Sequence, residues 1–238
     1  MPDARKHRGP HPEDRKLFAE DQLPALRAAV SELSWLLTRE YSIKAALKLV
    51  GDRHGLTERQ RLAVSRAACS DQSRKRRAAT RLDLQRLHDG SCIIDGFNII
   101  ITIEAALSGG VLLRGRDGCI RDLSSIHGSY RSVEETESSI VMIGSALAEF
   151  SAASVVWMLD RPVSNSGRLA QKIRCLAAER GWDWSVELAF NPDRIIAESD
   201  HIVISSDGPL LDQVKRWTNL ARQIIEKNLA DAWLIDLS

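Results

Sequence analysis

Long apolar runs, paired cysteines and a phosphate-binding P-loop are all missing from this sequence. No run of about 18 apolar residues occurs, so a membrane-spanning helix is not expected. The polar start lacks the apolar core of a signal peptide, and we therefore expect a cytoplasmic protein without a membrane partner. The four cysteines include no Cys-x-x-Cys pair, which argues against a disulfide framework or a zinc site. The absent P-loop lysine and spacing argue against an NTPase.

What the sequence does contain is an uneven distribution of charge. The net charge of the whole sequence is only +1. Its 44% of hydrophobic and 27% of charged residues are typical of ordinary globular proteins. Residues 1–90 nevertheless hold 19 basic and 12 acidic residues, whereas residues 91–238 hold 14 basic and 20 acidic ones. A basic half joined to an acidic half suggests a polyanion-binding module attached to a second module.

The basic half has the apolar spacing of short helices. Residues 1–15 are polar and contain several prolines, so we expect a flexible arm there. Residues 16–88 are expected to form a small all-α domain of the helix-turn-helix kind. It would contain an amphipathic helix from Asp21 to Arg39, a second helix capped by Ser42, and a third that starts at the capping box Thr57–Gln60.

Cations are concentrated at the end of this helical part. Nine of them lie within the 28 residues 59–86, against only two acids. Clustered arginines neutralise a nucleic-acid backbone, and the predicted phosphate-binding residues are Arg74, Lys75, Arg76, Arg77 and Arg81. The alternative is a solvated helical face followed by a linker, with the run Ser70–Arg77 as a candidate domain boundary.

Residues 89–238 alternate between strand-like and helix-like patterns. The apolar run 92–101 predicts a first buried strand, and a glycine-rich loop follows at 108–132. Further strands are expected at 154–159, 184–188, 201–206 and 232–237, with helices at 133–150, 166–180, 193–198 and 209–228. Repeated units of this size predict an α/β fold with a doubly wound, mostly parallel sheet of the Rossmann type.

Three aspartates are placed at or near the ends of predicted strands. Asp95 interrupts the first apolar run and is followed by Gly96, while Asp160 and Asp207 end later strands. Ligands of such sheets bind at the carboxyl ends of the strands. Three carboxylates in one crevice repel each other unless a cation is present, so the pattern predicts Mg²⁺ or Mn²⁺. The alternative for each aspartate taken alone is a turn cap.

Short motifs around these acids resemble a known group of enzymes. Asp95-Gly96-Phe97-Asn98 after an apolar strand resembles the opening of the PIN-like nuclease superfamily, particularly its NYN branch. Segment 156–160 is similar to the second strand and acid of that branch, and segments 193–197 and 203–208 resemble those with the third and fourth acids. The likeness covers about 91–238 and implies a metal-dependent ribonuclease of PIN-like fold. The whole chain also resembles an uncharacterised archaeal and bacterial family with a helical N-terminal part.

The resemblance assigns roles to individual residues. It implies metal ligation by Asp95, Asp160, Asp193 and Asp207, and catalytic roles for Asp95, Asp160, Asp207 and Asn98. Asn98 would orient Asp95 or a metal-bound water, and Ser206 would hydrogen-bond a carboxylate or the substrate phosphate. Asp193 has an equal alternative as a helix cap after Pro192, in which case Asp200 replaces it.

The loop 108–132 has no counterpart in the pattern of that superfamily. In a functional interpretation, its Asp122 reaches the metal, while Arg121 and His127 contact the scissile phosphate. In the alternative it is a surface loop with a turn at Asp117-Gly118. Most tryptophans are expected in the core, with Trp182 as a candidate for stacking on a base.

Together these patterns predict a metal-dependent ribonuclease that hydrolyses RNA phosphodiester bonds at a cluster of aspartates while the helical domain holds the RNA. The expected partner is RNA, with tRNA and other structured RNAs as candidates. The chain is also a candidate for forming a homodimer. Two alternatives stay open: a non-catalytic nucleic-acid-binding protein of the same fold, and a phosphatase-like hydrolase. The basic segment favours a polymeric substrate, and the acids favour catalysis.

Overall fold

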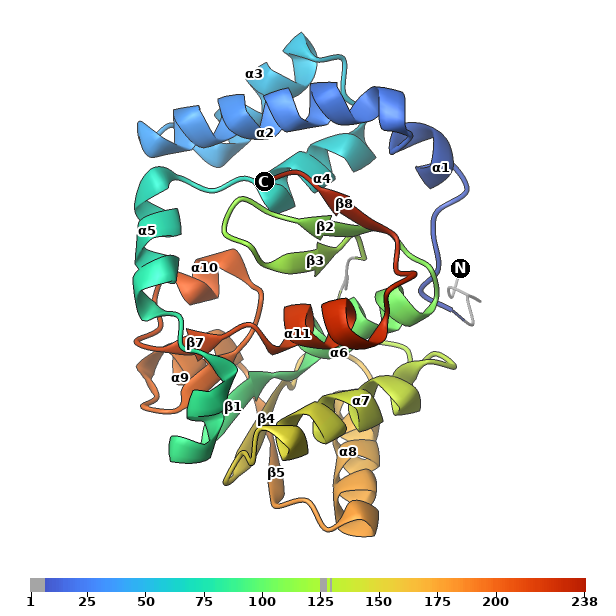
Figure 1. Ribbon diagram of the computed structural model, residues 1–238, viewed down its shortest axis with the longest axis vertical. Helices are drawn as coiled ribbons and strands as arrows, with labels where there is room; N and C mark the ends of the chain where they lie inside the picture. The colour runs from blue at the N-terminus through green and yellow to red at the C-terminus, as the bar shows by residue number, and fades with distance from the viewer. Residues whose placement is uncertain (1–6, 125–127, 129) are drawn as a thin grey trace.

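The N-terminal part of the computed structural model, which describes residues 7–124, 128 and 130–238, is a group of helices (Figure 1). They are α1 (Asp14–Leu17), the 3-10 helix η1 (Glu20–Gln22), α2 (Leu23–Thr38), α3 (Ile43–Arg53), α4 (Glu58–Ala67) and α5 (Asp71–Thr80). The predicted caps are confirmed: Ser42 accepts a hydrogen bond from the amide of Ala45, and Thr57 and Gln60 form a complete capping box.

Two interpretations of this part were wrong. The alternative in which Ser70–Arg77 is a linker fails, because Ser70 caps α5 and the helix continues to Thr80. The arm is not free from residue 8 onward. The Asp14 side chain is fully buried and paired with Arg59, and Arg8 reaches the buried carboxylate of Glu104. Burial of a carboxylate requires such a partner, so these two pairs fasten the arm to the helices and to the α/β part.

The centre of the α/β part is a five-stranded sheet in which every pairing is parallel. Its order is β5-β4-β1-β6-β7. The strands are β1 (Cys92–Asp95), β4 (Val155–Asp160), β5 (Trp184–Ala189), β6 (Ile202–Ile204) and β7 (Trp217–Thr218). The α/β class and the parallel sheet preceded by helices are as predicted.

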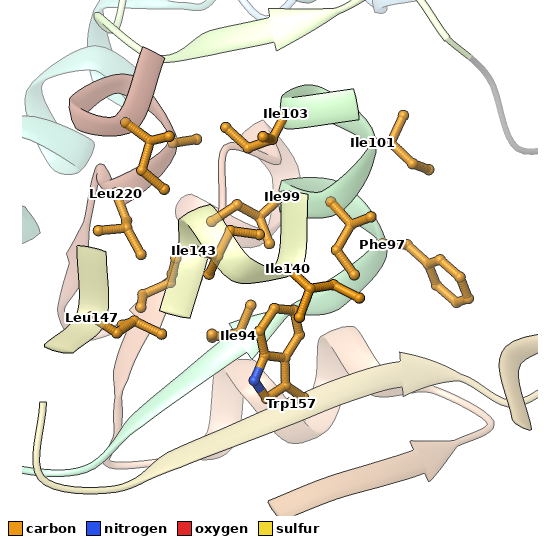
Figure 2. Close-up of a cluster of buried hydrophobic side chains, with 14 of the residues drawn as sticks. Ile94, Phe97, Ile99, Ile101, Ile103, Ile140, Ile143, Leu147, Trp157 and Leu220 are labelled. Atoms are coloured by element: carbon orange, nitrogen blue, oxygen red, sulfur yellow. The ribbon is translucent and has the colours of Figure 1, made fainter. Parts of the chain in front are cut away.

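Helices cover both faces of this sheet, as side chains of successive strand residues alternate between faces. One face, with Ile94 and Trp157, packs against α6 (Gly96–Leu107), α7 (Thr136–Glu149), α8 (Ser166–Arg180) and α11 (Leu220–Asn228). Figure 2 shows this core between the sheet and α6 and α7. The other face, with Ile93 and Val203, packs against α9 (Pro192–Glu198) and α10 (Gly208–Leu211).

A second, three-stranded sheet connects the helical part to the rest. It consists of β2 (Leu112–Arg114), β3 (Ile120–Asp122) and β8 (Leu234–Asp236), in the order β3-β2-β8. Leu113 and Ile235 from this sheet share one hydrophobic core with Leu26, Leu33 and other residues of α2 to α4. Figure 1 shows the sheet between those helices and α6, so no separate core marks off residues 16–88.

Three predicted elements differ in the structure. Residues 96–101 belong to helix α6 rather than to a strand, and they are buried because α6 lies between the two sheets. The loop 108–132 contains β2 and β3. The predicted helix 209–228 is divided into α10, β7 and α11, because Trp217 pairs in parallel with Val203 at the edge of the sheet. Among the described residues, no helix is long and apolar enough to cross a membrane.

Candidate functional site

The candidate site lies between β1 and β6, where the strand order of the five-stranded sheet reverses. From β1 the chain adds β4 and β5 on one side and β6 and β7 on the other, so the connections after β1 and β6 diverge. A crevice at such a switch point is the usual ligand site of a doubly wound sheet. Asp95 is the last residue of β1, and Asp207 follows β6 by three positions. Both therefore stand at this crevice.

Gly96 allows the chain to enter helix α6 directly after Asp95. A Cβ atom at this position would lie 2.6 Å from Cδ2 of Leu159 and 3.0 Å from the carbonyl oxygen of Met158, both on β4. Only glycine fits this close approach. The helix then begins one residue after the carboxylate and carries Asn98 in its first turn.

Hydrogen bonds hold Asp95 and Asn98 to the segment after β6. The Ser205 hydroxyl donates to Oδ2 of Asp95 at 2.8 Å. Oδ1 of Asn98 accepts from the Ser206 amide at 2.8 Å and from the Ser206 hydroxyl at 2.9 Å. Ser206 thus positions Asn98. Ser205, which the sequence analysis did not single out, contacts the carboxylate; only its place two residues before Asp207 pointed to it.

Asp207 has a structural task as well as a place in the site. Its Oδ1 accepts from the Leu210 amide at 2.9 Å and caps α10, while its own amide donates to Ser205 Oγ at 3.0 Å. The Ser205 hydroxyl therefore links Asp207 to Asp95: it accepts a hydrogen bond from the backbone amide of Asp207 and donates one to the carboxylate of Asp95.

Asp160 and Asp193 complete an acidic cluster, which we define as Asp95, Asp160, Asp193 and Asp207. Asp160 ends β4 and Asp193 lies in the first turn of α9, whose cap is the Asn191 side chain rather than Asp193 itself. Asp200, the substitute considered for Asp193, is instead exposed and paired with Lys215. The sequence prediction of four acids from distant positions is matched by their proximity, because the charges of all three other members act on Asp95.

The protonation of the cluster reflects burial and mutual repulsion. Loss of hydration, together with the charges of Asp207, Asp193 and Asp160, raises the pKa of Asp95 to about 7, although the hydrogen bond from Ser205 lowers it. Burial and the charge of Asp193 raise the pKa of Asp160, and burial and Asp207 raise that of Asp193. Neighbouring carboxylates that share no cation produce this pattern.

The donor set of the acidic cluster suits a hard divalent cation. Within the described part of the chain, no lysine or arginine forms an ion pair with any of its four members, and carboxylate oxygens are what Mg²⁺ and Mn²⁺ prefer. No group of three His, Cys, Asp or Glu side chains among the described residues stands ready to hold a metal ion. The residues therefore fit the ion by chemistry, without forming a closed cage.

The predicted phosphate-binding cations fall into two groups. Arg74, Lys75, Arg76 and Arg81 are exposed on or just after α5. Arg77 and Arg121 are not surface cations: their side chains are only 6% and 11% exposed and both pair with Asp117. They were mistaken for phosphate ligands because sequence composition does not separate a buried ion pair from a basic surface. His127 lies outside the described residues.

The two internal arginines connect the helical part to the site. Arg77 on α5 binds Asp117 at 2.6 Å and Asp212 at 2.8 Å. Arg121 shares Asp117 and donates from Nε to the Ser206 carbonyl oxygen at 2.7 Å. Burial alone would raise the pKa of Asp117, but the two guanidinium groups hold it at about 2. The ion pairs of Arg77 and Arg121 with Asp117 thus connect α5 to Ser206, the residue before Asp207.

Asp122 also has internal partners. It lies on β3, is 7% exposed, and accepts hydrogen bonds from Thr102 and from the Ser124 amide. The hydrogen bonds that Asp122 accepts from these neighbours favour a structural role over the metal contact considered from sequence.

A cleft of about 580 Å³ adjoins the acidic cluster. Residues around the α4–α5 junction, such as Arg66 and Ser73, line one wall, and Asn98, Ser206 and Asp207 line another. The cleft therefore opens between the helical part and the switch point. A ligand in it would touch both.

Fold and site together define an α/β protein with an acidic site at the switch point of a parallel sheet. Residues 84–223 match the family described as "Domain of unknown function (DUF5616)", and the chain belongs to this family. Residues 25–79 match "Protein of unknown function (DUF434)". An uncharacterized protein of Methanocaldococcus jannaschii is similar: it is 29% identical over 211 residues, which are 85% of this chain and 97% of that protein. No solved structure matches the chain.

Proposed function

We propose that this protein is a metal-dependent ribonuclease with a PIN-like active site. The observation that supports it is the acidic cluster: four aspartates from four separate segments perturb one another at the switch point, without a cationic partner among the described residues. Structural carboxylates of this protein, such as Asp14 and Asp117, are instead paired with arginines. The contrast favours a site that binds a cation over a site that serves folding.

Each part of the site has a role in this proposal. Asp95, Asp160, Asp193 and Asp207 would hold Mg²⁺ or Mn²⁺, which supplies activation of water and offsets charge developing on the phosphodiester. The Ser205 hydroxyl fixes the orientation of the Asp95 carboxylate. Asn98 Oδ1 accepts two hydrogen bonds from Ser206, and these fix the first turn of α6 against the segment after β6.

The choice of RNA as substrate rests on the helical part. Exposed Arg74, Lys75 and Arg76 form successive positions of α5, and α5 borders the cleft that leads to Asp207. Cations in this position would contact the backbone of a polymer that enters the acidic cluster. A small phosphorylated substrate needs no such row of cations, and this favours the ribonuclease over a phosphatase.

The test compares RNA cleavage in Mn²⁺ or Mg²⁺ by the native chain, Asp95→Asn and Asp160→Asn. We expect both variants to lose more than the roughly 10- to 100-fold that an outer-shell partner contributes. Manganese binding, followed by electron paramagnetic resonance, should weaken in parallel. The matched control is Asp183→Asn, an exposed aspartate that directly precedes the start of β5, at the opposite end of the sheet.

The outcomes separate the candidate functions. Cleavage lost in both site variants but kept in Asp183→Asn supports the nuclease. RNA binding without cleavage by any protein supports the non-catalytic alternative. Hydrolysis of small phosphomonoesters but not of RNA supports the phosphatase-like alternative. Equal cleavage by all four proteins places the activity outside the acidic cluster.

A further inference from the structure

Phe190 is the most exposed large hydrophobic side chain among the described residues, at 74%. It follows directly after the edge strand β5. Single exposed apolar side chains are common, so what distinguishes this ring is its surroundings. Trp182, the aromatic residue considered from sequence, is instead stacked on Trp184 at the other end of β5.

The location of Phe190 links it to the acidic cluster from two sides. Its preceding residue Ala189 is the parallel partner of Asp160, and the Arg161 amide donates to the Ala189 carbonyl oxygen at 2.8 Å. In the other direction, helix α9 with Asp193 begins at Pro192. The ring therefore stands at the carboxyl end of β5, beside the strand end that carries one member of the cluster.

Arg161 accompanies this ring. Its guanidinium carbon lies 4.9 Å from the centroid of the Phe190 ring, a cation–π distance. Asp160 directly precedes Arg161 in the chain, yet among residues 7–124, 128 and 130–238 this arginine forms no ion pair. Its charge thus stays available to an anion from solution. A flat apolar ring beside an available guanidinium complements a nucleotide, which has a flat base and a phosphate.

We propose that Phe190 and Arg161 form a subsite for one unpaired nucleotide of an RNA strand whose neighbouring phosphodiester lies at the acidic cluster. This inference rests on the proposed function and names its substrate: a single-stranded segment, because a paired base is already stacked within its helix. The base stacks on Phe190 and the phosphate meets Arg161. Base stacking on aromatic side chains tolerates all four bases, so the subsite selects strandedness rather than sequence.

The charge beside the ring favours this occupant over a second copy of the chain. Leu188 and Ile195 are also partly exposed, at 36% and 45%, on β5 and α9. An interface between copies would use this apolar surface, but it would also have to bury Arg161 without a carboxylate partner from its own chain, which is costly. A phosphate satisfies that charge directly.

The experiment measures binding of an unstructured oligouridylate in metal-free buffer. Phe190→Ala should weaken binding by roughly 5- to 150-fold, the loss expected for one stacked base. Phe190→Trp should bind the oligonucleotide about as tightly as the native chain, because it keeps an aromatic ring at this position. The fluorescence of its added indole should be quenched when the oligonucleotide binds. Leu188→Ala is the matched control and should bind like the native chain, since Leu188 is exposed on β5, two residues before Phe190. A duplex of equal length should compete poorly.

The readouts keep this inference apart from the nuclease proposal. Manganese binding should be unchanged in Phe190→Ala, and if the chain cleaves RNA, KM should rise while kcat stays within a few-fold. Binding that depends on Phe190 without any cleavage retains the subsite and rejects the nuclease. Equal affinity of Phe190→Ala and the native chain overturns the subsite. A dimer seen by sedimentation velocity that is lost in Phe190→Ala, with unchanged affinity for RNA, assigns the ring to an interface between copies.

Discussion

Asp95 is held in a setting that opposes its own ionisation. Burial and three neighbouring carboxylates raise its pKa from the usual 3.8 to about 7. The folded chain therefore binds a proton that the unfolded chain has released between about pH 4 and pH 7. Folding stability falls as the pH rises through this window, and above it the full cost of the charged form remains. A site prepared for a cation in this way destabilises the protein when the cation is absent.

Asp95→Asn should consequently stabilise the metal-free protein, and more so at pH 8 than at pH 4. The pKa difference sets a ceiling of about 4 kcal/mol, which partial solvent exposure of the side chain reduces to on the order of 2 kcal/mol. Thermal unfolding in a chelator at several pH values measures the effect. A gain that is independent of pH would mean that Asp95 is not protonated in the folded state. Saturating Mn²⁺ should reverse the order of stability, because the native cluster binds the ion more tightly than the Asp95→Asn cluster, in which an amide replaces the carboxylate.

Individual residues of the site were predictable to different degrees. Asp95, Asp160 and Asp207 stood out because each interrupts or ends an apolar segment, where a carboxylate is costly to bury. Asp193 was indicated only by the resemblance of its segment to the PIN-like pattern. Ser205 and Phe190 did not stand out, since a serine after a strand and a phenylalanine after a strand are common. Their roles depend on neighbours distant in sequence: Asp95 for Ser205, and Arg161 for Phe190.

At the scale of elements, helix α5 has two kinds of arginine side by side. Arg76 is exposed, whereas Arg77 is buried and paired with Asp117 and Asp212. Arg77→Ala would leave these carboxylates short of a partner and should cost about 3 kcal/mol of folding free energy. Arg76→Ala should change stability by less than about 0.5 kcal/mol. Denaturant unfolding of the two variants compares neighbouring positions with the same change.

RNA binding should show the opposite ranking. Arg76→Ala is expected to weaken RNA binding and to reduce the slope of log affinity against log salt by roughly 1, as for a lost phosphate contact. Arg77→Ala, measured at a temperature where it is folded, should keep the native salt slope. If Arg77 instead carried the salt dependence, its ion pairs would have to open when RNA binds.

Elements with local signals were predicted well. The capped helices α3 and α4 and helix α8, which ends at Gly181 in a left-handed conformation, begin and end near the expected residues. Helix α6 was missed because a helix buried on all sides has the same continuous apolar pattern as a buried strand. Strands β2, β3 and β7 are only two or three residues long. Their existence depends on partners elsewhere in the chain, which no local pattern reveals.

At the scale of the whole molecule, the two halves share a core. Val111, Leu113 and Ile235 pack with α2, α3 and α4 rather than with the five-stranded sheet. We expect a fragment of residues 89–238 to expose this apolar surface and to be insoluble or to bind a hydrophobic dye. Coexpression with residues 1–88 should restore a soluble complex. A monomeric fragment 89–238 that unfolds cooperatively at the native temperature would show that the halves fold independently.

The position of β8 has a consequence for the order in which the protein is made. Ile235 and Leu237 belong to the core of helices that stand at the beginning of the chain. A ribosome releases those helices first and delivers these two side chains only after the whole five-stranded sheet has been synthesised. Until then Val111, Leu113 and Leu123 fill the apolar face of the helices only in part. Segments that are far apart in the order of synthesis thus complete one core.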